Sequence, residues 1–247
     1  MDAVVAAKES AKAIVELGGG FMTAGPTYGR GGELGFSGID FYVLGRGGVL
    51  GDVDADVVAS GFIFWNPTQV RSQWETGRGV MAPDAAAREW AACCATWGEA
   101  NVPDTDGLDR LAALLTTVVN EASPAMASIF AGWRALPVPA TPKARVAHLT
   151  NALRELRGAL HGGALLAAGV SPAEAVAYRS AMMAPLFGWD PESITIDAAL
   201  KARWHDAEAA TDVAMAAPMS ALGDADRAEM VERLNAVHEA WTAAKGA

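Results

Sequence analysis

The sequence predicts an all-α fold, built as a single compact domain of many helices. Apolar residues recur at helical spacing through most of the chain, and no stretch alternates like a strand between turn residues. Hydrophobic residues make up 51% of the 247 positions, enough to bury a substantial core. We therefore expect one all-helical domain over residues 1–247, which allows a subdivision into 1–136 and 142–247 at the proline-rich corner 137–142.

The N-terminal elements follow from caps and glycines. A first amphipathic helix is expected from about Asp2 to Leu17, because a run of three glycines ends it. Between residues 21 and 79, glycines alternate with aromatic residues, which predicts either short helices packed unusually close together or space for a ligand. Asp54 and Asn66 are placed to cap two helices, the second with a proline at its first position.

The remaining helices are predicted from spacing, prolines and caps. The proline-rich residues 137–142 are expected to form a rigid corner. One helix is predicted to start at Ala82-Pro83. Further helices are predicted over Leu108–Ala122, a shorter one within Pro124–Leu136, and then Pro142–Gly169, Ser171–Met183, about Ile196–Ala216, and Asp224–Ala244.

The helix predicted over Pro142–Gly169 is the longest uninterrupted pattern in the chain. Its apolar stripe predicts packing against several other helices. The stripe consists of Val146, Leu149, Leu153, Leu156 and Leu160.

Arg157 and His161 lie one turn apart at the edge of this stripe. The nearby arginine favours a neutral imidazole, the form that serves as a general base or hydrogen-bond acceptor. Gly158, Gly162 and Gly163 leave the same face open to a ligand or a closely packed partner. The alternative is a histidine bonded to a backbone carbonyl beside a structural salt bridge.

Charge and cysteine content restrict the partners and the compartment. Nineteen basic residues against 29 acidic residues give a net charge of −10, which opposes general binding to phosphate backbones, and we expect no nucleic-acid partner. The adjacent Cys93 and Cys94 cannot link distant segments, which indicates a reducing, cytoplasmic compartment. The N-terminal helix is charged and no apolar run could span a bilayer, so we expect no membrane association.

A helix-turn-helix order occurs at residues 165–179, where a glycine turn and the cap Ser171 separate two helical patterns. The second pattern carries Glu174 and only one basic residue, Arg179, so a plain αα-hairpin is favoured over a DNA reader.

Two other patterns carry no site. Gly45-Arg46-Gly47-Gly48 lacks the spacing of a phosphate loop. His148, His205 and His238 have no partners at metal-ligand spacing, so no metal is expected.

Three stretches together resemble an all-helical actinobacterial family usually labelled helix-turn-helix or SalK-like. The stretch up to Pro67, including GIDFYVLGRGGVLGDVDADVVASGFIFWNP, is similar to the family's aromatic, G-R, L-G and aromatic-Pro elements, with Arg46 at its arginine. LRELRGALHGGALLAAG at residues 153–169 is similar to its L-R-E-H-R-G-D-G-H-x-x-x-L-L-x-x-G pattern. Residues 211–244 resemble its C-terminal helices.

The chain also departs from the family pattern. In the second stretch Arg157, Gly158 and His161 match, whereas Leu156 replaces a histidine and Ala159 an aspartate. Residues 190–210 are too few for the winged-helix segment that the family carries there. The resemblance therefore implies shared arginine and histidine positions more than a shared DNA-reading part.

These patterns predict that the glycine- and aromatic-rich N-terminal third packs over the His161 helix and leaves an apolar pocket. The leading hypothesis is a cofactor-independent enzyme of specialised metabolism or catabolism that acts on a small apolar or aromatic substrate. His161 would be the general acid/base, and Arg157 and Arg46 would orient an anionic or carbonyl oxygen of the substrate. The expected substrate-binding residues are Arg46, Tyr42, Tyr28, Phe62 and Trp65. The alternative is a non-catalytic ligand-binding or regulatory protein that has lost DNA reading, and a homo-oligomer stays open.

Overall fold

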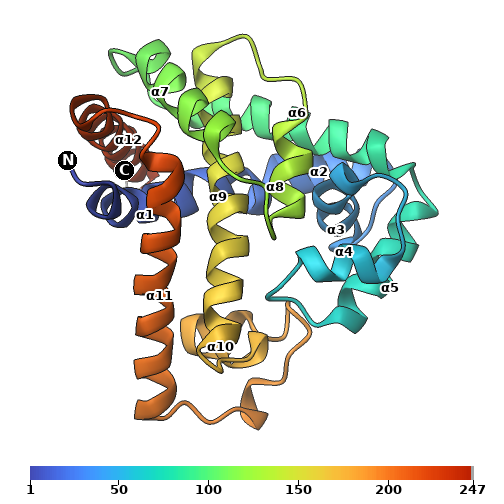
Figure 1. The fold of residues 1–247 in the computed structure, drawn as a ribbon. Coiled ribbons are helices and arrows are strands. Elements are labelled where there is room, and N and C mark those ends of the chain that lie inside the picture. The colour runs from blue at the N-terminus through green and yellow to red at the C-terminus, as the bar shows by residue number, and fades with distance from the viewer. Residues whose placement is uncertain (246–247) are drawn as a thin grey trace.

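Helices surround one central helix, α9 (Pro142–Ala167), in a computed structural model that describes residues 1–245 (Figure 1). No strand occurs in this described part, so the all-α prediction is confirmed. The other α-helices are α1 (Ala3–Gly19), α2 (Gly25–Glu33), α3 (Asp40–Gly47), α4 (Ala55–Gly61), α5 (Pro67–Arg78), α6 (Pro83–Asn101), α7 (Leu108–Glu121), α8 (Ser128–Arg134), α10 (Pro172–Ser180), α11 (Ala198–Met219) and α12 (Asp224–Lys245). Short 3-10 turns lie at Gly20–Thr23, Gly48–Leu50, Ala181–Met183 and Pro191–Ser193.

Helix α9 begins where Pro142 occupies its first position, as the sequence predicts. Val146, Leu149, Leu153 and Leu156 of the predicted stripe are buried, and Leu160 is half-buried. The helix packs against α1, α6, α7, α8 and α11, which explains why it needs more than one apolar face. One continuous hydrophobic core includes residues from both sides of the proline-rich corner, and the fold is a single compact domain.

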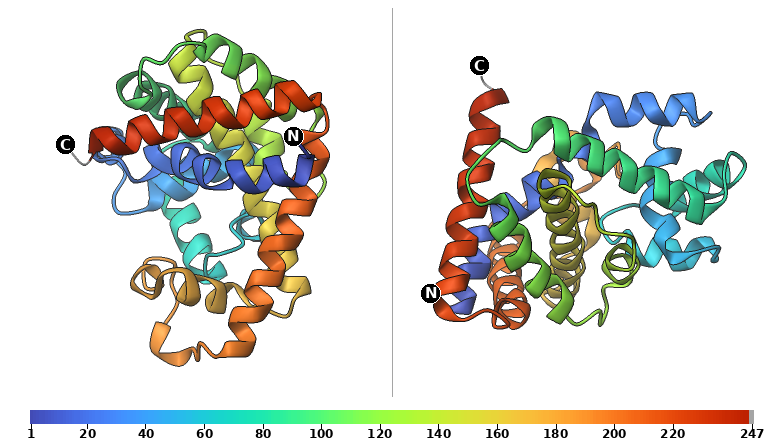
Figure 2. Two further views of the ribbon diagram at one scale, coloured as in Figure 1. Left: turned by 90° about the vertical axis from the view of Figure 1, so that its left-hand side faces the viewer. Right: turned by 90° about the horizontal axis from the view of Figure 1, so that it is seen from above.

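Helix α1 packs against both α11 and α12 on one side of α9 (Figure 2). In the right-hand part of Figure 1, α3 packs against α5 and α6, and α4 packs against α5. Helix α10 lies at the lower end of α9 and contacts both α9 and α11. The cavity described below is bounded by these two groups of helices.

The glycine-rich N-terminal third consists of short, closely packed helices, as predicted. A Cβ atom at Gly45 would lie 2.8 Å from Cβ of Trp90 on α6. At Gly48 it would lie 2.0 Å from the carbonyl oxygen of Pro83. Both are far below ordinary van der Waals contact, so these glycines allow the backbones of two segments to approach.

Some helix boundaries differ from the prediction. Helix α8 starts at Ser128 because Met126, with a φ of 62°, breaks the helical path after Pro124. Helix α11 runs on to Met219 although Pro218 lies in its last turn. Burial of Pro218 and Met219 offsets the lost backbone hydrogen bond.

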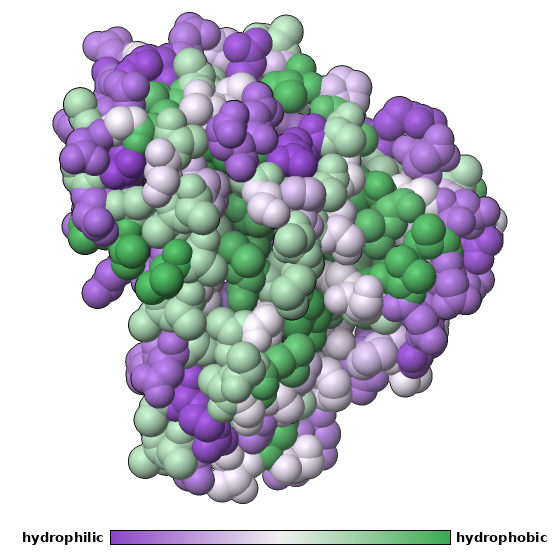
Figure 3. All heavy atoms as spheres, viewed as in Figure 1, coloured by the Kyte–Doolittle hydropathy of each residue, from purple (hydrophilic) through white to green (hydrophobic). Residues whose placement is uncertain are grey.

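None of the helices in the described residues is long and apolar enough to cross a membrane. On the face shown in Figure 3, apolar residues gather along the middle, between the α11 side and the α3–α5 side. Hydrophilic residues gather at the upper and right-hand edges.

Candidate functional site

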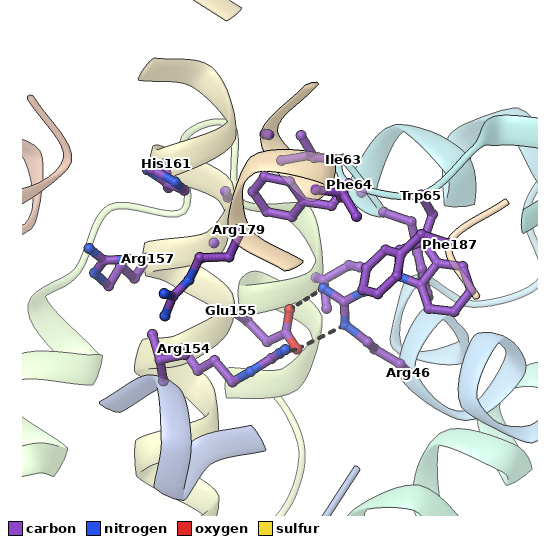
Figure 4. A pocket seen from close by; sticks show the side chains of 18 of the residues that line it. Arg46, Ile63, Phe64, Trp65, Arg154, Glu155, Arg157, His161, Arg179 and Phe187 are labelled. Atoms are coloured by element: carbon purple, nitrogen blue, oxygen red, sulfur yellow. Dashed lines mark hydrogen bonds and ion pairs between the residues drawn. The ribbon is translucent and has the colours of Figure 1, made fainter. Parts of the chain in front are cut away.

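A cavity of about 680 Å³ lies against one side of α9. Its walls come from α1, α3, α8, α9, α10 and α11, together with the segment from Gly61, the last residue of α4, to Trp65. Figure 4 shows the charged side chains of α9 on one side and the aromatic side chains of the N-terminal third on the other. The volume falls within the range of small-molecule sites.

His161 lies in the cavity wall with its tautomer determined by Thr211 on α11. The Nδ1 atom of His161 is 3.0 Å from the hydroxyl oxygen of Thr211. That hydroxyl donates its only hydrogen to the carbonyl oxygen of Ala207 at 2.7 Å. The threonine must therefore accept from His161, so Nδ1 carries the proton and Nε2 of the neutral ring holds a lone pair.

The second ring nitrogen of His161 lies 3.4 Å from a carboxylate oxygen of Glu208. Burial lowers the pKa of His161, Glu208 opposes this shift, and Arg157 and Arg179 lower it further. The ring is therefore neutral near pH 7. A proton taken up by Nε2 would be stabilised by the adjacent carboxylate, which is the behaviour of a general base.

Arg157 lies one turn earlier on α9 and is only 8% exposed. Its Nη2 atom donates to Glu208 at 2.5 Å and lies 3.8 Å from Asp212. Burial raises the pKa of Asp212, which Arg157 opposes. Arg157 is therefore already paired with Glu208 of α11, and it holds the carboxylate that faces His161.

Arg46 reaches the cavity from α3 and forms a bidentate ion pair with Glu155 of α9. The two hydrogen bonds measure 2.9 and 2.7 Å. The guanidinium also lies over the ring of Phe62, with 4.4 Å to the ring centroid. Burial alone would raise the pKa of Glu155, but the arginine outweighs it and holds the pKa below its ordinary value.

The apolar wall is formed by aromatic side chains that contact one another across the chain. Trp65 lies 4.6 Å from Phe187 and 5.2 Å from Tyr42, measured between ring centroids. The indole of Trp189 donates to the carbonyl oxygen of Phe64 at 2.8 Å. These contacts attach the segment between α10 and α11 to the N-terminal third and close one side of the cavity.

Two of the three glycines predicted to open this face of α9 have different roles. A Cβ atom at Gly158 would meet no atom within 4 Å, so this position borders open space. At Gly162 it would lie 2.5 Å from a methyl carbon of Ile63, so this glycine permits close packing. Each alternative predicted from the sequence therefore applies to one position.

Most of the residues proposed from the sequence line this one cavity. They are His161, Arg157, Arg46, Tyr42, Phe62 and Trp65. Arg46 and His161 lie at different ends (Figure 4). Tyr28 on α2 does not line the cavity and is 38% exposed, because α2 lies on the other side of the aromatic cluster.

Sequence reasoning missed several polar residues of the site. Glu155 had a detectable signal, since it is a carboxylate between the stripe residues Leu153 and Leu156. Glu208 and Thr211 had none, because α11 shows no strong apolar pattern and its register against α9 depends on packing. Arg154 and Arg179 were missed as well, together with the aromatic residues Trp204 and Phe187. Within residues 1–245, no three His, Cys, Asp or Glu side chains are grouped to hold a metal ion.

Comparison with known proteins identifies one relationship. A family model described as a helix-turn-helix family matches residues 7–247. No curated protein and no solved structure matches the chain significantly.

The match corrects the expectation that nucleic acid is not a partner. A helix-turn-helix is a DNA-binding arrangement, so the family match conflicts with that exclusion. The expectation rested on the net charge of the whole chain, and a whole-chain charge does not determine the potential of a local surface. Duplex DNA therefore belongs among the partners to be tested.

Proposed function

The chain belongs to the helix-turn-helix family that matches residues 7–247. We propose that this member binds a small, largely apolar or aromatic molecule. It would act on that molecule by acid/base chemistry without a cofactor. The observation that carries the proposal is the cavity itself. One wall holds a neutral imidazole of defined tautomer, and the other wall is aromatic. This combination of apolar surface and a few placed polar groups is typical of small-molecule sites.

In the proposed reaction, Nε2 of His161 removes a proton from the bound molecule. Glu208 stabilises the resulting imidazolium, and the ring later returns the proton to the product. Arg157 acts as a positioning residue, since it pairs with Glu208. No net proton is gained or lost, so the chemistry fits an isomerisation, elimination or hydrolysis.

The test begins with a thermal-shift screen of small aromatic and apolar compounds against the purified protein. Compounds that raise the melting temperature are then incubated with the wild type and with His161→Ala, and turnover is followed by mass spectrometry. His205→Ala is the matched control, because His205 is exposed and does not line the cavity. We expect turnover in the wild type and the control, and none in His161→Ala at nearly unchanged melting temperature.

Arg157→Lys separates positioning from charge. Lysine keeps the positive charge but loses the planar guanidinium that donates to Glu208. If Arg157 holds Glu208 in place, turnover falls and its pH profile shifts. If His161→Ala unfolds the protein and no compound moves the wild type, His161 is structural and the proposal fails.

A second function, that of a ligand-responsive regulator, is favoured by the position of α10. This helix follows the glycine turn of the helix-turn-helix pattern, and Ala175, Val176 and Arg179 from it line the cavity. A ligand would therefore contact the second helix of the motif directly. Selection of duplex DNA from a random pool, with and without a cavity ligand, tests this function. A ligand-dependent change in DNA affinity without turnover would favour it over the enzyme.

Finer assignments are supported by the sequence alone. The LRELRGALHGG stretch supports placing the chain in a SalK-like, actinobacterial group, with a role in specialised metabolism or catabolism. The two adjacent cysteines, which cannot link distant segments, support a cytoplasmic location. Metabolite profiling of a strain that lacks the gene tests the role. Sedimentation analysis tests the homo-oligomer.

A further inference from the structure

The charges around the cavity differ in sign from those of the whole chain. The chain has a net charge of −10, whereas basic side chains outnumber acidic ones in the cavity wall. The basic residues are Lys12, Arg46, Arg154, Arg157 and Arg179, and the acidic residues are Glu16, Glu155 and Glu208. An excess of positive charge in a partly apolar cavity favours an anionic ligand.

Most of these charges are already compensated within the protein. Glu155 pairs with both Arg46 and Arg154, at 2.7 and 3.1 Å. Glu208 pairs with Arg157 at 2.5 Å. A ligand carboxylate that approached Arg46 or Arg157 would have to displace a buried or half-buried carboxylate, and would gain little.

Glu16 is occupied as well. Its carboxylate lies 2.7 Å from Nε2 of His238, a buried histidine of α12. It therefore faces a partner outside the cavity wall and is not available to neutralise a basic side chain within it.

Arg179 on α10 differs from the other arginines of the cavity. It is exposed, and among residues 1–245 its side chain has no hydrogen bond or ion pair to another side chain, whereas Arg46, Arg154 and Arg157 each have one. Figure 4 shows its side chain reaching from α10 into the cavity toward α9. Its charge lowers the pKa of His161, which agrees with a position close to the imidazole.

Open space also borders α9 at Gly158. Gly158 lines the cavity on α9 between the turns that carry Arg154 and His161, and nothing lies within 4 Å of a Cβ atom placed there. Any larger residue would project into this space. The aromatic wall, including Phe64 and Trp65, lies across the cavity and offers a surface for an apolar group.

We infer that the ligand is an aromatic or similarly apolar carboxylic acid, whose carboxylate pairs with Arg179 above Gly158 and whose apolar part lies against Phe64 and Trp65. This inference rests on the proposed function, in that it assumes a small molecule in the cavity. It moves the anion-binding role from Arg46 and Arg157, expected from the sequence, to Arg179. The carboxylate would lie on the side of the cavity that carries His161.

The test compares 2-naphthoate with 2-naphthamide, which has the same shape without the charge, by isothermal titration calorimetry. We expect the acid to bind the wild type about fivefold more tightly than the amide, the upper end for an ion pair at an exposed arginine. Arg179→Gln should reduce the affinity for the acid to that for the amide. Arg88→Gln, which removes the same charge from an exposed site on α6, should change neither.

A cavity-blocking variant shows where binding occurs and separates the two proposals. Gly158→Leu fills the open space, so it should abolish binding of both compounds. If the wild type binds acid and amide equally, or if Arg179→Gln keeps the preference for the acid, the inference is wrong while small-molecule binding stands. If neither compound nor any member of a panel of aromatic acids and their amides binds, the inference and the proposed function both fail.

Discussion

The ion pair between Arg46 and Glu155 gives the sharpest test of how the cavity is held together. It joins α3 to α9 across the cavity, with hydrogen bonds of 2.9 and 2.7 Å. The side chain of Glu155 is 2% exposed and that of Arg46 is 12% exposed. Glu155→Gln keeps the shape of the side chain but leaves the guanidinium without a compensating charge.

The magnitude follows from the burial of the two partners. Removing one partner of a buried ion pair typically costs about 3 to 5 kcal/mol, because the remaining charge stays desolvated. Arg46 borders the cavity, where water can reach part of it, so we expect a loss of about 3 kcal/mol. Replacing both residues, as in Arg46→Met with Glu155→Leu, removes both charges and should cost clearly less than the two single changes together.

Urea unfolding of the four proteins in this double-mutant cycle measures the coupling. Arg88→Gln with Asp84→Asn is the control pair, because these side chains are exposed and should show no measurable coupling. The pKa of Glu155 is lowered, so its stabilisation is present at neutral pH and is lost as the pH falls below about 4. A loss below about 1 kcal/mol in Glu155→Gln, or strict additivity in the cycle, would refute the reasoning.

Three further predictions concern stability. Leu153→Ala and Leu156→Ala should each cost about 2 to 5 kcal/mol in denaturant melts, and a loss below about 1 kcal/mol would show that the stripe is not core. Burial lowers the pKa of His148 to about 4, so the folded state loses stability as the pH falls from about 6.5 toward 4. His148→Phe should reduce this loss by about 3 kcal/mol, and an equal pH dependence of the unfolding free energy in the variant and the wild type would contradict the prediction. Gly158→Ala should raise the melting temperature, because alanine favours a helix more than glycine does and the added Cβ atom meets nothing, whereas at Gly98 it would lie 3.0 Å from backbone atoms of α9 and Gly98→Ala should lower the melting temperature. A lower melting temperature for Gly158→Ala than for Gly98→Ala would contradict this prediction.

Helix positions were predictable because their signals are local. Asp2 caps α1 by accepting from the backbone amide of Val4, and Asn66 caps α5 in the same way. Ser171 and Glu174 form a complete capping box at α10. Each cap needs only residues within three positions of one another, so the sequence contains all the information.

The site was predictable only as far as one helix extends. The spacing of Arg157 and His161 places both on one face of α9, and both line the cavity. The pairing of Arg46 with Glu155 joins residues 109 positions apart, and no local pattern reports it. Tyr28 was grouped with Tyr42 because both lie in the aromatic stretch, but shared composition does not determine which face of a short helix meets the cavity.

The packing of α10 connects the cavity to the helix-turn-helix pattern of residues 165–179. Leu165, Val170, Ala175 and Ala207 form a small hydrophobic cluster, separate from the main core, and Phe64 and Trp204 pack against it. Helix α10 is therefore attached mainly through this minor cluster, and segments with few buried apolar contacts open more readily than the rest of a protein. A ligand that pairs with Arg179 and contacts Trp65 would join α10 to the main core across the cavity. Ligand binding would then stabilise α10 in one position, whether the ligand is a substrate or a regulatory signal.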